Sequence, residues 1–430
     1  MHRREWIYLG ATLGGTAALT AILSRAPRGH SRGLSESGLE KSDGPLALPP
    51  GFRQTILSRS GTAMSDGLRT PDLPDGMACF QGPDGSYVLM RNHEIGRSPS
   101  RGAFPQGQPS LAFDRGQDGG VSRLVVDPKT LAVKRSNMVL TGTTLNCSGG
   151  PSPFGYLTCE ETENTGHGWV FLCDPAASSL AAPRPLHGYG RFRHEAAAVD
   201  PRTLCAYLSE DQNDGCLYRF VPRDPGAPFE GRLQVARAAG QANFDTAAMR
   251  RGASLEIEWV EIPDPAAKQT PTREQGSERG ALTIRRAEGI WFDAGRTGSR
   301  PSVLVSATTG GTAGKGQIFR LILGDARRPD RLELIAEAPP LGGLQFPDNI
   351  TVAPWGEPIV AEDGMGPQHL RGIRPDGTSY VIARNVASDS EFAGVCFSPD
   401  GSTLFCNLQR DGLTIAIRGP WDKVQDLPSS

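Results

Sequence analysis

The feature that most constrains the fold is a succession of short apolar runs separated by strong turn signals. Runs such as 216–221 and 302–306 are rich in β-branched and aromatic residues, which favour strands. Pro-Asp-Gly occurs at 83–85, 375–377 and 399–401, and this tripeptide is typical of tight turns. No stretch of the body keeps a helical hydrophobic period beyond about three turns. The pattern therefore predicts an all-β fold with many short strands.

The number and spacing of these runs favour a single β-propeller. The chain has 430 residues, and 53 Gly and 35 Pro supply the turns that such a fold needs. At about 40–60 residues per blade, the segment 49–430 gives six to eight blades. We expect six, because polar stretches such as 231–280, with a short helix near 243–250, are expected to be loop insertions. An assembly of two-sheet sandwiches is the alternative architecture.

The N-terminal segment has the features of an export signal. Arg3-Arg4 precedes an uncharged, weakly apolar run at 6–23. This arrangement resembles a twin-arginine signal, so we expect a signal segment at 1–29 and a linker at 30–48. The protein would then be periplasmic or secreted, with no membrane span in its mature form. A retained N-terminal anchor is the alternative.

Charge and cysteine content narrow the choice of partners. The chain has 45 Lys+Arg against 47 Asp+Glu, and this balance argues against nucleic-acid binding. We expect a monomer that acts on a small molecule. None of the eight cysteines shows the paired spacing of a zinc ribbon. Cys205/Cys216 and Cys396/Cys406 are each about one hairpin apart, which leaves disulfides and buried free thiols both open.

A thiol and two carboxylates follow directly after an apolar run at Cys159, Glu160 and Glu161. Burying such groups side by side is costly, because like charges repel and each has lost its water. A bound cation removes this cost. A thiolate favours a transition metal such as iron, whereas carboxylate oxygens favour calcium. The alternative is a strand end with solvated acids and an inert cysteine.

Turns of the same kind recur along the chain. In a propeller, strand ends from every blade meet at one mouth of the central channel, so these acids would converge and require several cationic charges. Taken singly, each turn has a plainer interpretation; His93 and His194, for example, are compatible with core histidines. The acid-bearing turns are 91–94, 158–161, 193–195, 209–212, 286–289, 346–349 and 361–364.

Several of these segments together resemble the PhoX family of exported alkaline phosphatases. The matching stretches are 146–161, 190–195, 207–212, 215–222, 287–289, 348–350, 362–364, 391–394 and 397–405. The resemblance implies a β-propeller that holds iron and calcium ions at its axis and hydrolyses phosphate monoesters.

The resemblance also implies roles for individual residues. Cys159 and Glu195 would ligate iron, with Asp348 nearby. Calcium would be held, or bridged to iron, by Asn92, Glu94, Glu160, Glu288 and Glu362, and Glu210 is a further acid expected to bind metal. Arg193 and Arg286, together with Lys315, are the candidates for gripping phosphate.

The expected function is therefore that of a metal-dependent phosphoric monoester hydrolase with Fe³⁺ and Ca²⁺. A calcium-dependent propeller lactonase or esterase is one alternative, and a non-catalytic propeller with structural calcium sites is another. Cys159 distinguishes the phosphatase from the lactonase or esterase, because a site with calcium alone does not require a thiolate.

Overall fold

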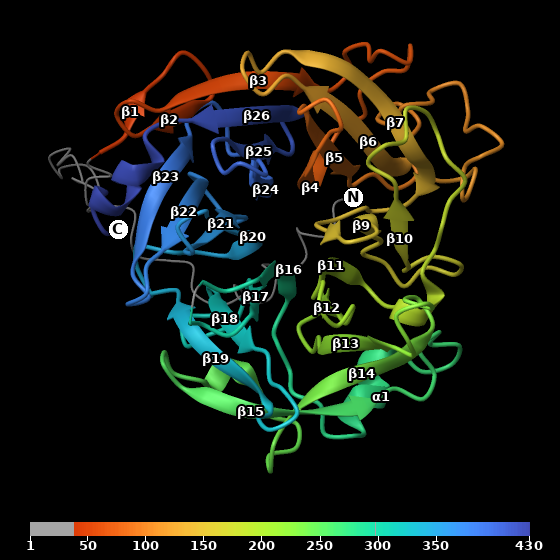
Figure 1. The fold of residues 1–430 in the computed structure, drawn as a ribbon, viewed down its shortest axis with the longest axis vertical. Coiled ribbons are helices and arrows are strands. Elements are labelled where there is room, and N and C mark those ends of the chain that lie inside the picture. The colour runs from red at the N-terminus through yellow and green to blue at the C-terminus, as the bar shows by residue number, and fades with distance from the viewer. Residues whose placement is uncertain (1–37, 297) are drawn as a thin grey trace, which may run out of the picture. The chain divides into compact units, whose positions relative to one another are not determined.

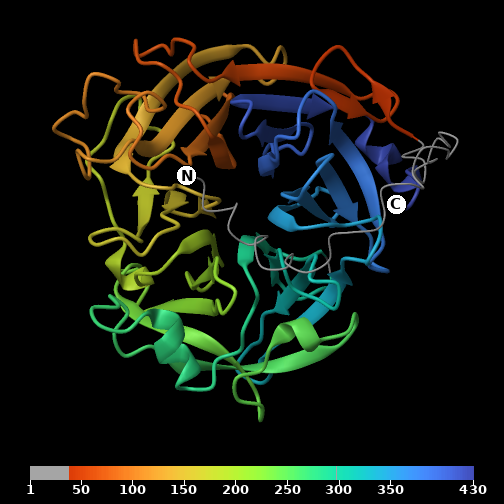
Figure 2. The ribbon, with the colours of Figure 1, turned by 180° about the vertical axis from the view of Figure 1, so that it is seen from behind.

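A computed structural model describes residues 38–296 and 298–430. These residues form a β-propeller, in which antiparallel sheets are arranged around a common axis (Figures 1 and 2). The all-β expectation is confirmed. The expected signal segment at 1–29 lies outside the described residues. Within the described part of the chain, no helix has both the length and the apolar character that crossing a bilayer would require.

The strands fall into six groups around the axis, and each group runs from its innermost strand outward. The first is β4 (Pro74–Gln81), β5 (Tyr87–His93), β6 (Gly119–Val126) and β7 (Val133–Thr143). The second is β8 (Gly150–Ser152), β9 (Gly155–Cys159) and β10 (Val170–Cys173). The third is β11 (His194–Val199), β12 (Ala206–Glu210), β13 (Leu217–Pro222) and β14 (Gly231–Ala238).

The remaining groups complete the ring. The fourth is β16 (Ala287–Asp293), β17 (Ser302–Ala307), β18 (Gln317–Ile322) and β19 (Asp330–Glu337). The fifth is β20 (Pro347–Val352), β21 (Pro358–Glu362), β22 (His369–Ile373) and β23 (Ser379–Asn385). The sixth is β24 (Phe392–Phe397), β25 (Leu404–Leu408), β26 (Leu413–Arg418) and β3 (Arg53–Arg59).

Strands from the start of the chain close the ring. β3 pairs with β26, so the sixth group combines both ends of the described chain and β3 is its outermost strand. β1 (Glu40–Lys41) and β2 (Leu46–Leu48) extend the fifth group beyond β23. Part of the stretch expected to be a linker is thus in a sheet, because Leu46 and Leu48 are buried against the core.

The third and fourth groups are joined into one nine-stranded sheet by β15 (Ser254–Glu261), which pairs with β14 on one side and β19 on the other. The segment 231–280, expected to be an insertion, therefore contributes two strands. It also holds a 3-10 turn, η3 (Thr246–Ala248), near the expected helix, and the short helix α1 (Thr272–Ser277). The other helical turns of the described chain are η2 (His187–Tyr189) and η4 (Trp421–Asp426).

The hydrophobic core lies between neighbouring sheets. One cluster joins the fifth and sixth groups through residues such as Ile359, Tyr380 and Ile415. Middle strands such as β17 are buried along their whole length, which explains their continuous apolar sequence. The Pro-Asp-Gly turns lie where they were predicted, with Gly85, Gly377 and Gly401 at positive φ.

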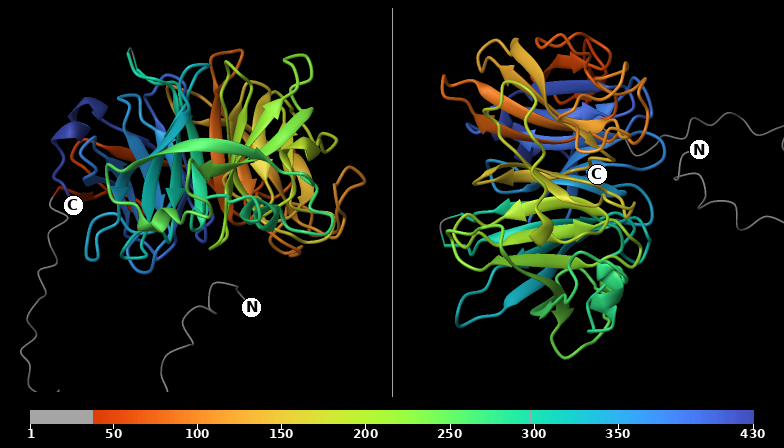
Figure 3. Two further views of the ribbon diagram at one scale, coloured as in Figure 1. Left: turned by 90° about the horizontal axis from the view of Figure 1, so that it is seen from below. Right: turned by 90° about the vertical axis from the view of Figure 1, so that its right-hand side faces the viewer.

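The innermost strands lie side by side around the axis and run along it (Figure 3). Their close approach requires small residues. At Gly76 a Cβ atom would lie 1.8 Å from the backbone oxygen of Ser148, just before the next group, so no larger residue fits there without moving the backbone.

Candidate metal centre

Bulges in the innermost strands carry acids. The ladders to the second strands break register between Pro74/Met77, His194/Ala197, Ala287/Ile290, Pro347/Ile350 and Ala393/Cys396. The first residue inside four of these breaks is an acid, namely Asp75, Glu195, Glu288 and Asp348. A β-bulge turns a side chain out of its ladder direction, and such bulges are frequent at functional sites.

Three of these acids, Asp75, Glu195 and Glu288, belong to a continuous line of potential ligands. Three groups of residues offer ligand atoms that lie within 4.8 Å of one another. Cys147 belongs to the first two groups and Glu195 to the last two, so the groups share members and form one cluster. The groups are Asp75/Glu94/Cys147, Cys147/Glu161/Glu195 and Glu195/Asp211/Glu288. We call these seven residues the axial cluster.

The axial cluster is electrostatically unfavourable on its own. Burial raises the pKa of the Glu195 carboxyl well above its usual value, and the neighbouring Glu288 raises it further. Burial and the charge of Asp211 raise the pKa of Glu161 to about 7. Burial and Glu195 likewise raise the pKa of the Cys147 thiol. Multivalent cations would remove this repulsion, as they do in other acid-rich sites.

Two buried oxygen atoms indicate that a bound cation, and not protonation of the acids alone, offsets the repulsion in the axial cluster. Among the described residues, neither Asn92 Oδ1 nor Glu195 Oε2 has a hydrogen-bond partner. Asn92 Nδ2 donates to the backbone oxygen of Cys147, so the amide lies next to the axial cluster. Buried polar atoms are rarely left without a partner, and a bound cation is one explanation for such an atom. The donor set, six carboxylates, an amide oxygen and one sulfur, fits metal ions.

Two arginines partly neutralise the axial cluster. Arg193 bonds to Glu161, and Arg286 bonds to Glu288 and, through Nε, to Asp211 Oδ1 at 2.8 Å. Each side chain is 22% exposed. Both arginine side chains therefore contact buried acids while remaining partly exposed to solvent.

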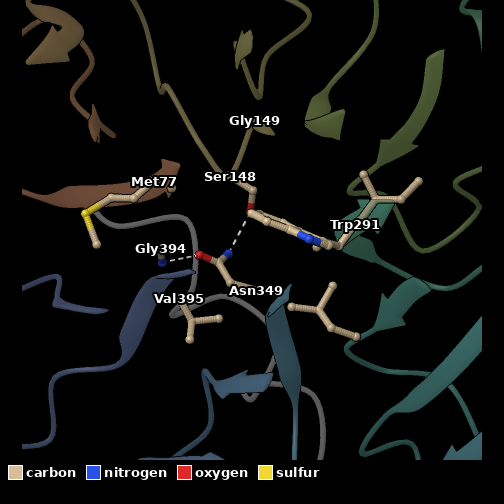
Figure 4. Close-up of a pocket in the computed structure, with 11 residues that line it drawn as sticks. Met77, Ser148, Gly149, Trp291, Asn349, Gly394 and Val395 are labelled. Carbon is tan, nitrogen blue, oxygen red and sulfur yellow. Dashed lines mark hydrogen bonds between the residues drawn. The ribbon is translucent and has the colours of Figure 1, made fainter. Parts of the chain in front are cut away.

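A small pocket on the axis adjoins the axial cluster (Figure 4). Ser148, Asn349 and Trp291 line it, with glycines of the inner strands completing the wall. Trp291 reaches across the pocket toward Ser148, while Asn349 hydrogen-bonds to Ser148 and Gly394.

Comparison with known families identifies the chain. The sequence model described as "Alkaline phosphatase PhoX" matches residues 35–132 and 122–412. The chain belongs to the PhoX alkaline phosphatase family. This membership confirms the resemblance of the sequence motifs and, with it, the expected class of enzyme, a metal-dependent phosphoric monoester hydrolase.

A solved structure from the same comparison supports the fold. Pseudomonas fluorescens PhoX in complex with vanadate, a transition state analogue, has 19% sequence identity and a TM-score of 0.67, covering 87% of this chain and 96% of that chain. A gluconolactonase from Xanthomonas campestris is a weaker match, with 12% identity, a TM-score of 0.41, and coverage of 89% and 100%. A search of curated protein sequences found no match.

In this PhoX-family chain, four of the residues expected to bind metal lie at the axial cluster: Asn92, Glu94, Glu195 and Glu288. Asp348 lies close by, since its charge contributes to the raised pKa of both Glu195 and Glu288. The structure gives the positions of these residues, and their roles as ligands stay predictions.

Glu160 points away from the axial cluster. Its carboxylate accepts hydrogen bonds from the backbone N–H groups of Thr144 and Gly168 and contacts His167 Nδ1 at 2.7 Å. The next residue, Glu161, enters the cluster instead. Successive residues of an extended chain point to opposite sides, so only one of two adjacent acids can face the axis.

Glu210 and Asp211 repeat this arrangement. Glu210 accepts hydrogen bonds from the Tyr218 hydroxyl at 2.7 Å and from the Cys216 N–H at 3.3 Å, while Asp211 enters the axial cluster. Glu362 is also engaged elsewhere, by Arg371 Nε at 2.6 Å and His369 Nδ1 at 2.8 Å. None of the three groups includes Glu160, Glu210 or Glu362.

The sulfur in the axial cluster belongs to Cys147 rather than Cys159. Cys159 is fully buried in a hydrophobic cluster with Leu157 and Val170. Cys147 Sγ instead lies 3.4 Å from Glu161 Oε2. All eight cysteines are free, so neither pairing considered from the sequence is a disulfide.

Sequence reasoning thus assigned no ligand role to four members of the axial cluster, Asp75, Cys147, Glu161 and Asp211, although it placed two of them in acid-bearing turns. A signal for one of them was present. Asp75-Gly76 repeats the acid-glycine pair of Glu288-Gly289, and both pairs occupy a bulge in an innermost strand.

Proposed function

We propose that this PhoX-family protein hydrolyses phosphate monoesters at cations held by the axial cluster. The observation that carries the proposal is the line of seven buried ligand residues, together with the unpartnered oxygens of Asn92 and Glu195. Such a concentration of buried acid is costly without bound cations, and it has no evident structural purpose.

The donor atoms suggest how two kinds of metal would be divided. The groups that contain Cys147 combine a sulfur with carboxylates, which suits Fe³⁺. The group Glu195/Asp211/Glu288 offers oxygen alone, which suits Ca²⁺. Cations bound there would supply positive charge to the phosphate oxygens and activate water for attack on phosphorus.

The chain itself would orient the phosphate through Arg193 and Arg286. Each guanidinium reaches from solvent to an acid of the axial cluster, and Arg193 Nε is buried without a hydrogen-bond partner among the described residues. When cations neutralise the acids, the guanidinium groups can turn their donors to a phosphate ester. The planar fork of arginine matches two phosphate oxygens at once.

The direct test is turnover of a chromogenic phosphomonoester by the purified, metal-loaded protein. We expect turnover that chelation abolishes and that returned metal restores. A diester and a lactone serve as comparison substrates, and we expect much slower turnover of both. A fully metal-loaded protein that leaves the monoester intact would overturn the proposal. Faster hydrolysis of the lactone would favour the lactonase alternative.

We also propose that the protein acts outside the cytoplasm as a monomer, as expected for an exported family. Replacement of Arg3-Arg4 by Lys-Lys should hold the protein in the cytoplasmic fraction of its host, because a twin-arginine signal depends on that pair. Light scattering of the purified protein should give the mass of one chain.

A further inference from the structure

Glu195 has the central position in the axial cluster. It is shared by one of the two groups that contain Cys147 and by the group that offers oxygen ligands alone. Its two carboxylate oxygens differ in their surroundings. Oε1 accepts hydrogen bonds from Ser148 Oγ at 2.9 Å and from the Ser148 backbone N–H at 3.4 Å, whereas Oε2 is buried without a partner among the described residues. One oxygen is therefore held by the protein, and the other remains available to a cation.

The hydrogen bond to Glu195 belongs to a chain with a fixed direction. Asn349 Oδ1 accepts from the backbone N–H of Gly394, and this unambiguous donor sets the orientation of the amide. Asn349 Nδ2 must then donate to Ser148 Oγ, at 2.6 Å. A serine hydroxyl has a single proton, so with Asn349 as donor that proton points to Glu195.

This series of hydrogen bonds connects four parts of the ring of strands around the axis. Asn349 lies in β20, Gly394 in β24 and Glu195 in β11, while Ser148 follows Cys147 and lies two residues before β8 of the second group. Figure 4 shows the Asn349–Ser148 and Asn349–Gly394 bonds at the pocket on the axis. Asn349 Nδ2 also donates to Asp348 Oδ1 at 2.9 Å, which ties a second acid near the cluster to the same amide.

We propose that Ser148 and Asn349 are positioning residues that hold the shared carboxylate of Glu195 in its cation-binding orientation. The proposal rests on the metal centre of the proposed function. Without the Ser148 hydroxyl proton, Oε1 keeps only the longer hydrogen bond from the Ser148 backbone N–H at 3.4 Å, and the carboxylate can rotate. Without Asn349, the Ser148 hydroxyl has no donor to fix its direction. Partners that orient a ligand carboxylate in this way typically change metal affinity about 10–100-fold when removed.

The test compares Ser148→Ala and Asn349→Ala with a matched control, Ser306→Ala. Ser306 is also buried near the axis, but among the described residues its hydroxyl donates to backbone oxygens alone, those of Gly289 and Asp348. Each metal-loaded protein is mixed with excess EDTA, and the metal that remains bound is measured over time by elemental analysis. Thermal unfolding of each variant is recorded in parallel.

We expect Ser148→Ala and Asn349→Ala each to lose metal at least about 10-fold faster than the unaltered protein. The rate of metal loss from Ser306→Ala should stay within about twofold of that of the unaltered protein, even if its melting temperature falls as far as those of the other two variants. Because the two positioning residues act in series, the double variant should lose metal no faster than the more affected single variant. If Ser148→Ala does not fold, Asn349→Ala carries the comparison with Ser306→Ala.

The proposal would be overturned if Ser148→Ala and Asn349→Ala lost metal at the same rate as Ser306→Ala. It would also be overturned if the fold-increases in the rate of metal loss of the two single variants multiplied in the double variant. A purified protein that holds no metal would overturn it together with the proposed function. A third outcome is faster metal loss from Ser148→Ala and Asn349→Ala than from Ser306→Ala, in a protein that does not hydrolyse phosphomonoesters. That outcome would overturn only the proposed function, because metal retention is measured without substrate.

Discussion

Replacing either of two buried cysteines separates a structural thiol from a metal-binding one. Cys159→Ala removes one sulfur from a hydrophobic cluster, a loss comparable to one buried methylene, and should cost about 1 kcal/mol of stability. Cys147→Ala should cost about the same in metal-free protein. With metal present, the loss of a ligand shared by two groups should weaken binding at least about 100-fold, which removes a further 2.7 kcal/mol or so of ligand-linked stability.

The assay is thermal unfolding of both variants and the unaltered protein, with and without EDTA, with elemental analysis of each sample. For a chain of this size, 1 kcal/mol corresponds to a shift of about 1 °C in melting temperature. The two variants should match in EDTA and differ by about 3 °C in metal, with Cys147→Ala the less stable. Metal loss from Cys159→Ala, with full retention by Cys147→Ala, would refute the reasoning.

Three further predictions concern charged residues. Glu195→Gln should abolish metal retention yet raise the melting temperature in EDTA by about 1–3 °C, because it relieves like-charge repulsion; a lower melting temperature would contradict this. Glu362→Gln should destabilise the fold by about 3 kcal/mol, by weakening a buried ion pair with Arg371, while metal per folded chain is unchanged in elemental analysis. Arg193→Ala should lower kcat/KM for a phosphomonoester about 10–100-fold in steady-state assays without loss of metal; unchanged kinetics would remove Arg193 from the site.

Much of the fold is readable from the sequence, but the strands nearest the axis are not. Middle strands such as β17 are mainly apolar runs because sheets cover both of their faces. The innermost strands β11 and β16 have the sequences HEAAAV and AEGIWFD, which resemble turns. Each carries an acid beside small residues near its start, and the small residues allow close packing around the axis.

The candidate site was predicted at the level of segments rather than of individual residues. Pairs such as Glu160-Glu161 and Glu210-Asp211 mark the right positions along the chain, but the choice within each pair depends on strand register. That register is set by tertiary contacts, such as those of Glu160 with His167 and of Glu210 with Tyr218, which local sequence does not reveal.

The most direct test of the central claim is anomalous diffraction from crystals of the metal-loaded protein. We predict cation peaks along the axial cluster, within about 2.0–2.6 Å of Cys147 Sγ and of the carboxylate oxygens of Glu195. Peaks beside Cys159 and Glu160, or a fully loaded crystal with no peak between Cys147 and Glu288, would contradict the account.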